Sequence, residues 1–168
     1  MVNPEISIIV SVFKGQEFFS IFLENLSQQS AINLCEVIII LNNPTKEEFS
    51  ILLKLVETYS FIKINVIQLD FVESIYQSWN RAWKIAKGKY ITSWNIDDFR
   101  FPNSLQDQYN FMELNPDIHI CYGDFLEKYI NTNKIVQHIT PEFSKNVFSR
   151  KFLSGGAFLM WRNFLKED

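Results

Sequence analysis

The chain opens with a short, apolar and β-branched run, Ile6-Ser7-Ile8-Ile9-Val10-Ser11-Val12-Phe13. A run of this kind, closed by the break Lys14-Gly15-Gln16, is typical of a strand that is buried on both faces of a sheet. Residues 35–41, 61–69 and 89–94 repeat the pattern further along the chain. The sequence therefore predicts several buried strands, and each of them needs helices to cover it.

Apolar residues at helical spacing lie between these strands. The second and third expected helices begin with capping-box pairs, Thr45 with Glu48 and Ser74 with Gln77. Gly88 is expected as the C-cap of the third helix. Strands that alternate with helices indicate βαβ units, so the expected fold class is α/β, with a mainly parallel central sheet flanked by helices.

The last third of the chain is less regular. Residues 118–125 are expected to form a strand, and residues 129–139 part of a hairpin. Gly155-Gly156 opens a short apolar run over residues 157–161. No internal repeat or linker divides the chain, so residues 1–168 are expected to form a single domain.

Composition narrows the classes of function. The chain has 168 residues, of which 47% are hydrophobic and 21% charged, as in a globular domain. Its net charge is −3 and it lacks a Lys/Arg cluster, which argues against nucleic acid as a partner. No signal peptide or membrane-spanning run is expected. Cys35 and Cys121 lack metal-ligand spacing, so they are expected to be buried thiols in a reducing compartment.

Ligands of such sheets bind beyond the carboxyl ends of the strands, which points to residues 11–15, 42–45 and 95–99. The most informative of these loops holds two adjacent acids, Asp97 and Asp98, directly after a strand. Carboxylates placed there suit Mn²⁺ or Mg²⁺, which prefer hard oxygen ligands. The alternative is that the acids only form a turn and cap the next helix.

Two polar side chains near these loops are further candidates. The amide of Asn42 both donates and accepts, which suits a nucleobase or a ribose. Arg81 could pair with a phosphate. The alternatives are a simple turn that starts a helix and a solvent-exposed helical arginine, respectively.

Taken in order, these pieces resemble the family-2 glycosyltransferases of GT-A fold. The first strand is similar to the family's S-I-I-I-P-V-Y, and residues 80–91 are similar to its N-x-G-x-x-x-A-x-G-x-Y-I. Asn95-Ile96-Asp97-Asp98 falls where the family carries D-x-D-D. Asn115-Pro116-Asp117 and Tyr122-Gly123-Asp124 also match in order, so the resemblance covers nearly the whole chain.

The resemblance implies an inverting transfer of sugar from a nucleoside-diphosphate sugar, with Mn²⁺ or Mg²⁺ as cofactor. It places the metal at Asp97, with Asp98 beside it, and the donor nucleotide near Ser11, Phe13 and Asn42. Asn95 and Arg81 complete the expected donor-binding set. A nucleotide-binding half would span about 1–100 and an acceptor-side half about 101–168.

The resemblance also implies the class of acceptor and the cellular location of the protein. The acceptor would be a carbohydrate or a lipid-linked molecule. Such an acceptor would put the protein in the cytoplasm, with peripheral association at the inner face of the membrane, by analogy alone.

Four residues at three places in the chain depart from the family pattern. Asn95 replaces the first acid of D-x-D, Asn42-Asn43 replaces an acidic turn, and Ser11 replaces a proline. An inverting transferase also needs a general base, which the family supplies downstream of the Gly-Gly segment. The only acids after Arg162 are Glu167 and Asp168, so no catalytic residue is assigned.

Two other classes of function therefore stay open. One is a degenerate GT-A domain that binds a nucleotide or a protein without turnover. Like the transferase, it would be a domain that is short at its C-terminal end. The other is a nucleotidyltransferase-like enzyme, although only Lys14-Gly15 stands where its glycine-rich basic loop is expected.

Overall fold

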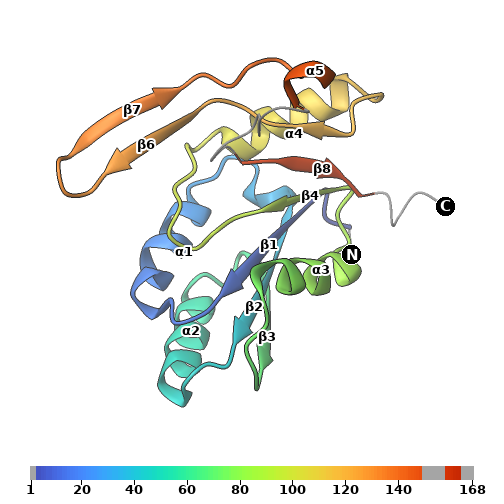
Figure 1. Cartoon of the computed structure of the whole chain (residues 1–168). Coiled ribbons are helices and arrows are strands. Elements are labelled where there is room, and N and C mark those ends of the chain that lie inside the picture. Colours follow the sequence, from blue (N-terminus) through green and yellow to red (C-terminus); the bar gives the residue numbers. More distant parts are fainter. Residues whose placement is uncertain (1–2, 149–157, 164–168) are drawn as a thin grey trace.

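A six-stranded sheet with strand order β3-β2-β1-β4-β8-β5 forms the centre of the computed structural model, which describes residues 3–148 and 158–163 (Figure 1). Its strands are β1 (Ile6–Val12), β2 (Cys35–Asn42), β3 (Lys63–Leu69), β4 (Tyr90–Ser93), β5 (Ile120–Cys121) and β8 (Met160–Arg162). The helices are α1 (Phe19–Ser27), α2 (Lys46–Thr58), α3 (Ile75–Ile85), α4 (Ser104–Leu114) and α5 (Lys145–Phe148). Short 3₁₀ helices, η1 (Gln16–Phe18) and η2 (Ile32–Leu34), precede α1 and β2.

The sheet is mixed, but most of it is parallel. β1 pairs in parallel with both β2 and β4, and β2 pairs in parallel with β3. β8 runs antiparallel to β4 and β5. The expected α/β class with a mainly parallel sheet is confirmed, and the antiparallel β8 comes from the irregular last third of the chain.

Helices cover both faces of the sheet, which explains why its central strands are apolar on both sides. One face packs against α1, α2 and α4, with Phe22, Leu52 and Met112 fully or almost fully buried. The other face packs against α3, where Ala82 and Ala86 lie against the isoleucines of β1 and β2. Small residues on α3 let the helix approach the sheet closely, while larger side chains fill the first face.

The capping box at the start of α3 is confirmed, but the expected helix end is wrong. The Ser74 hydroxyl accepts from the Gln77 backbone, and the Gln77 side chain accepts from the Ser74 backbone. Ala86 is the C-cap, with φ −59° and ψ 134°. Gly88 lies two residues further on and instead packs against β1, where its N–H donates to Ser7 Oγ at 2.8 Å. A close approach between two backbones explains this glycine, not a helix end.

Other expectations need smaller corrections. Thr45 caps α2 as expected, but the Glu48 carboxylate accepts from the Gly15 N–H at 3.2 Å instead of returning to the cap. The strand expected over residues 61–69 starts only at Lys63. The strand expected over residues 118–125 is interrupted after Cys121, where its pairing with β8 ends.

The expected hairpin is present as β6 (Phe125–Tyr129) and β7 (Lys134–His138), which pair with each other in a separate two-stranded sheet (Figure 1). The hairpin projects away from the main sheet (Figure 1). The apolar run over residues 157–161 supplies the start of β8. Gly155-Gly156, which precedes that run, lies outside the described residues.

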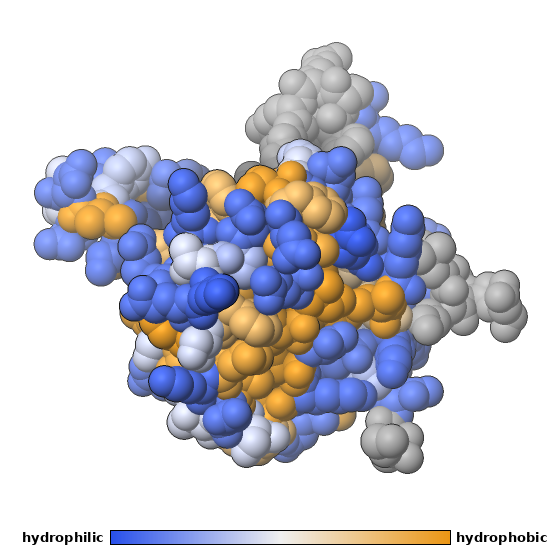
Figure 2. All heavy atoms as spheres, turned by 90° about the horizontal axis from the view of Figure 1, so that it is seen from below, coloured by the Kyte–Doolittle hydropathy of each residue, from blue (hydrophilic) through white to orange (hydrophobic). Residues whose placement is uncertain are grey.

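Hydrophobic side chains also reach the surface. The loops that follow β1, β3 and β4 expose Phe13, Phe71 and Phe99, each by about half or more. The face of the molecule seen from below carries a broad hydrophobic stripe (Figure 2). In the part of the chain that the structure describes, no helix is long and apolar enough to cross a bilayer.

The two cysteines are free and buried, as expected. Burial raises the pKa of the Cys35 thiol to about 12 and that of Cys121 to about 11. Since the thiolate is the reactive form, we expect neither thiol to react with a disulfide reagent at pH 8 while the protein is folded. Both should react at once in denaturant. Rapid labelling of the native protein, followed spectroscopically, would contradict this burial.

Candidate functional site

The carboxyl ends of β2, β1 and β4 lie side by side, so the loops that follow them share one edge of the sheet. The Trp94 N–H donates to the Ile9 carbonyl at 3.0 Å, which holds the start of the acidic loop against β1. A Cβ placed on Gly15 would lie 3.4 Å from Ile96 Cγ2, so the loop after β1 packs directly on the acidic loop. These loops form the candidate site, at the edge where the parallel topology predicts a ligand.

A buried tryptophan fixes the acidic turn. The Trp94 ring packs edge-on against Phe22, with ring centroids 5.4 Å apart. Its Nε1–H donates to the Asp98 carbonyl at 3.0 Å, and the Asp98 N–H donates to the Asn95 carbonyl at 3.1 Å. The turn is therefore anchored in the core, while Asp97 and Asp98 themselves lie at the surface of the molecule.

The two carboxylates differ in their surroundings. Asp98 Oδ2 accepts from the Asn95 amide at 2.9 Å, whereas Asp97 makes no hydrogen bond or ion pair with the residues that the structure describes. Partial burial raises the pKa of Asp98, and the Asp97 charge raises it further, while the Asn95 amide and Arg100 oppose the shift. Two neighbouring negative charges with so little compensation are well placed to attract a cation.

Arg100 lies beneath this turn, and sequence reasoning missed it. The side chain is almost fully buried and donates to Thr92 Oγ1, Ser104 Oγ and Gln108 Oε1. Its guanidinium lies 3.9 Å from the centroid of the Phe158 ring. Burial lowers the pKa of Arg100 to about 9, so the group is still charged at neutral pH. Arg100 ties β4 to the start of α4 and places a fixed positive charge near Asp98.

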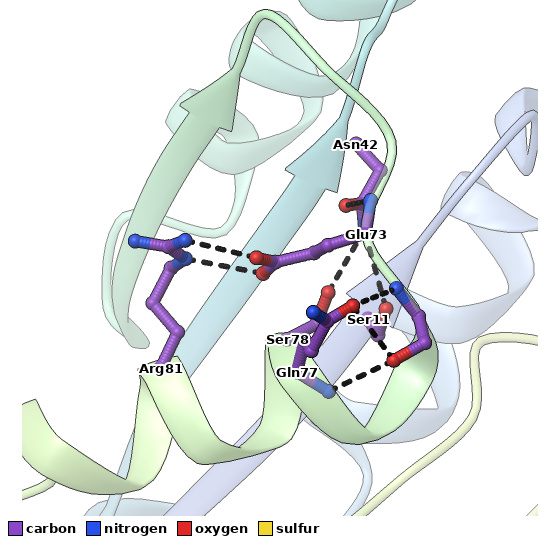
Figure 3. Close-up of polar contacts among 7 residues, drawn as sticks. Ser11, Asn42, Glu73, Gln77, Ser78 and Arg81 are labelled. Atoms are coloured by element: carbon purple, nitrogen blue, oxygen red, sulfur yellow. Dashed lines mark hydrogen bonds and ion pairs between the residues drawn. The ribbon is translucent and has the colours of Figure 1, made fainter.

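Asn42 lies at the same edge, but its side-chain amide is hydrogen-bonded to other residues of the chain. The amide nitrogen donates to Ser11 Oγ, Val12 O and Ser78 Oγ at 3.1–3.3 Å. The amide oxygen accepts from the Glu73 N–H at 3.2 Å (Figure 3). Asn42 thus joins the ends of β1 and β2 to the loop before α3, which makes it a positioning residue at the expected nucleotide site.

The Arg81 side chain forms an ion pair with the carboxylate of Glu73. Its Nε and one terminal nitrogen donate to the two oxygens of Glu73 at 3.1 and 2.9 Å (Figure 3). The hydrogen bonds from Arg81 hold the pKa of Glu73 below its usual range. The only ion pair that Arg81 makes with the described residues is this one with Glu73, and neither acid of the turn that follows β4 takes part in it.

The remaining candidates of the donor-binding set lie at the end of β1. Ser11 is half-buried and accepts from Asn42, and Phe13 is exposed. The Lys14 ammonium lies 5.2 Å from the centroid of the Phe13 ring. The structure thus brings Ser11 and Asn42 together, places Asn95 with the acid pair, and pairs Arg81 with Glu73.

The chemistry of the acidic turn fits a divalent cation. Mg²⁺ and ions like it are commonly held by one or two carboxylates, with water and substrate phosphates completing the shell. Asp97 and Asp98 offer such a pair, exposed at the edge of the sheet. Within residues 3–148 and 158–163, no group of three or more His, Cys, Asp or Glu side chains is placed to hold a metal alone.

A cavity of about 640 Å³ lies at the opposite, amino-terminal end of the parallel strands. Its lining includes Lys87, Lys89 and Arg162, with Glu5 as its one acid among the residues described. It lacks the carboxylate pair that a divalent cation needs. The geometry at the carboxyl edge, and not the size of this hollow, identifies the candidate site.

Some of the site residues carry a sequence signal and others do not. Glu48 stands at the third helical position after Thr45, which marks it as a capping partner, although it bonds Gly15 instead. Glu73 and Arg100 sit in no motif. Their partners lie across the start of α3 and across the β4–α4 connection, so only the folded chain reveals them.

Comparison with known proteins shows the family and the fold of the chain. The model of glycosyl transferase family 2 matches residues 7–167. The uncharacterized glycosyltransferase MJ1057 of Methanocaldococcus jannaschii is 26% identical over 126 residues, which make up 73% of this chain and 42% of that protein.

Solved structures share the fold. The mannosyltransferase PcManGT from Pyrobaculum calidifontis, in complex with GDP-Man and Mn²⁺, aligns with a TM-score of 0.72 at 13% identity, over 99% of this chain and 47% of that one. S. aureus TarS 1–349 in complex with UDP-GlcNAc aligns with a TM-score of 0.68 at 19% identity, over 98% and 47%. The chain thus spans less than half the length of these proteins, and the family match over residues 7–167 shows that it belongs to glycosyl transferase family 2.

Proposed function

We propose that the chain binds a nucleoside-diphosphate sugar at the carboxyl edge of its sheet and acts in an inverting, metal-dependent glycosyl transfer. One observation supports this most strongly. Asp97 and Asp98 lie exposed on a turn that the Trp94 indole N–H anchors beside the end of β1. Structural neighbours that bind GDP-Man with Mn²⁺, or UDP-GlcNAc, support a donor of this class.

Different residues of the chain would bind the cation and the nucleotide. Asp97 and Asp98 would hold Mn²⁺ or Mg²⁺, and Asn95 orients Asp98. The cation would neutralise negative charge on the diphosphate as it leaves. Ser11 and Phe13 would line the nucleotide, and Asn42 would position the loops around it. No general base is assigned, because Glu167 and Asp168 lie outside the described residues.

The acceptor would be a carbohydrate or a lipid-linked molecule, met at the cytoplasmic face of a membrane. The exposed rings of Phe71 and Phe99 at the same edge support contact with an apolar acceptor or with the membrane surface. A nucleotide-binding module without turnover is the second candidate. Asn95 favours it, because an amide that already bonds Asp98 stands where the family places a carboxylate.

Calorimetry with UDP and GDP, with and without Mn²⁺, tests donor binding. We expect at least one of the two to bind, more tightly with Mn²⁺ than without, because the cation bridges the acid pair and the diphosphate. Absence of binding by both nucleotides at millimolar concentration with Mn²⁺ would rule out the donor site. Hydrolysis of a sugar nucleotide would then separate the transferase from the module that only binds.

A further inference from the structure

The segment that follows the acid pair is held by one amide side chain. Asn25 Oδ1 accepts from the Arg100 N–H, and Asn25 Nδ2 donates to the Arg100 carbonyl, both at 2.9 Å. Asn25 is 5% exposed and Arg100 is 2% exposed, so both bonds lie in the interior, where they are stronger than in water. The amide thus binds both backbone groups of one residue, as a partner strand does.

Helix α1, which carries Asn25, also packs against the start of the acidic turn. Phe22 lies three residues before Asn25, and residues at this spacing share one face of a helix. The Phe22 ring packs edge-on against Trp94, whose Nε1–H donates to the Asp98 carbonyl. One face of α1 therefore contacts the chain both before and after the two acids.

The residues that follow α1 extend this contact. The Ser30 N–H and hydroxyl both donate to the Pro102 carbonyl, at 2.9 and 3.2 Å. The Gln29 amide nitrogen also donates to the Arg100 carbonyl, at 3.4 Å. The connection from β4 to α4 is thus fixed on α1 and its C-terminal end over residues 100–102.

The position of these fixed points matters for a divalent cation. Asp97 and Asp98 lie between Trp94 and Arg100, so a shift at either end moves their carboxylates. Mg²⁺ demands near-octahedral geometry, whereas Ca²⁺ accepts a more flexible arrangement of ligands. Loss of a group that orients metal ligands without touching the metal typically lowers metal affinity by about 10–100-fold.

We propose that Asn25 is a positioning residue for the cation site. It fixes the end of the acidic turn and thereby sets how Asp97 and Asp98 approach a single ion. The amide acts through the Arg100 backbone and not by contact with the cation or the nucleotide. The inference rests on the proposed metal-dependent donor site and adds a residue, far from the acids in sequence, that controls which cation this site prefers.

Asn25→Leu tests this role, because leucine has a similar size but cannot bond the Arg100 backbone. The affinity for UDP or GDP is measured by calorimetry over a range of Mn²⁺, Mg²⁺ and Ca²⁺ concentrations. We expect the variant to need about tenfold more Mn²⁺ or Mg²⁺ for the half-maximal effect, and to lose less with Ca²⁺. Nucleotide binding without metal should be unchanged.

Ser7→Ala is the matched control. Ser7 is buried in β1, at the end of the strand opposite to the acidic turn, and its hydroxyl also makes two hydrogen bonds, to Glu36 and from the Gly88 N–H. Its loss should lower the melting temperature but leave the metal dependence intact. Asn25→Thr keeps a hydroxyl that can make only one of the two bonds, so it should show a smaller change of the same kind and replaces Asn25→Leu if that variant does not fold.

The other outcomes separate this inference from the proposed function. Wild-type metal dependence in folded Asn25→Leu or Asn25→Thr would overturn the positioning role. An equal change in Ser7→Ala would overturn it as well, since any loss of stability would then have the same effect. Wild-type protein that responds to Ca²⁺ as strongly as to Mg²⁺ would contradict a fixed acid pair without recourse to variants. Wild-type protein that binds nucleotide with no effect of any metal, or binds none, would contradict the proposed function itself.

Discussion

Asp97→Asn is expected to abolish the metal-dependent part of nucleotide binding without weakening the fold. The substitution keeps the shape of the side chain and removes one of the two charges that would hold the cation. If Mn²⁺ tightens the binding of UDP or GDP about 100-fold, which corresponds to about 2.7 kcal/mol, the variant should bind at the level seen without metal. Titration of each nucleotide with and without Mn²⁺ measures the difference.

The same substitution should leave thermal stability unchanged or slightly higher. Asp97 is exposed and bonds to no described residue, so its replacement breaks no contact of the fold. It also removes repulsion of Asp98, whose pKa the Asp97 charge helps to raise. The change in the free energy of unfolding should stay within about 0.5 kcal/mol, as for other surface positions.

Asp117→Asn is the matched control, because it removes an exposed acid far along the chain from the turn. Its metal-dependent binding should match that of the wild type. If Asp97→Asn instead retained the full effect of Mn²⁺, the acid pair would not be the cation site. A large drop in melting temperature would show that Asp97 supports the fold, contrary to its lack of contacts.

The features that could be predicted from sequence are those encoded by neighbouring residues. Buried strands such as β1 and β2 are apolar along their whole length, because helices cover both sides of the sheet. The N-caps Thr45 and Ser74 act within a single turn. The acidic turn follows from the rule that ligands bind at the carboxyl ends of parallel strands.

The features that escaped prediction depend on contacts between distant parts of the chain. The pairing of β8 with β4 joins segments about 70 residues apart, and no local pattern sets its direction. Arg81 looked like a free cation because the loop that carries Glu73 had no expected structure. Asn42 looked like a ligand contact because its four internal partners lie on three other segments.

Gly88 also makes its contacts with a distant part of the chain. Its substitution is the second change from which we expect a large effect. A Cβ on Gly88 would lie 2.5 Å from the Ser7 backbone nitrogen and 2.8 Å from the Ile6 carbonyl carbon. Both are backbone atoms of the central strand β1, which is bonded on each side to β2 and β4 and cannot move aside. Gly88→Ala should therefore push the chain between α3 and β4 away from the sheet.

The expected cost of Gly88→Ala is about 3 kcal/mol or more, because overpacking against a rigid backbone lies at the upper end of such effects. In a protein of this size that corresponds to a fall of roughly 6–12 °C in melting temperature. Gly123→Ala is the control, since a Cβ there would meet no atom within 4 Å. It should stay within about 0.5 kcal/mol of the wild type. Equal stability of the two variants, measured by urea or thermal unfolding, would mean that β1 and the segment before β4 are not packed as closely as the structure places them.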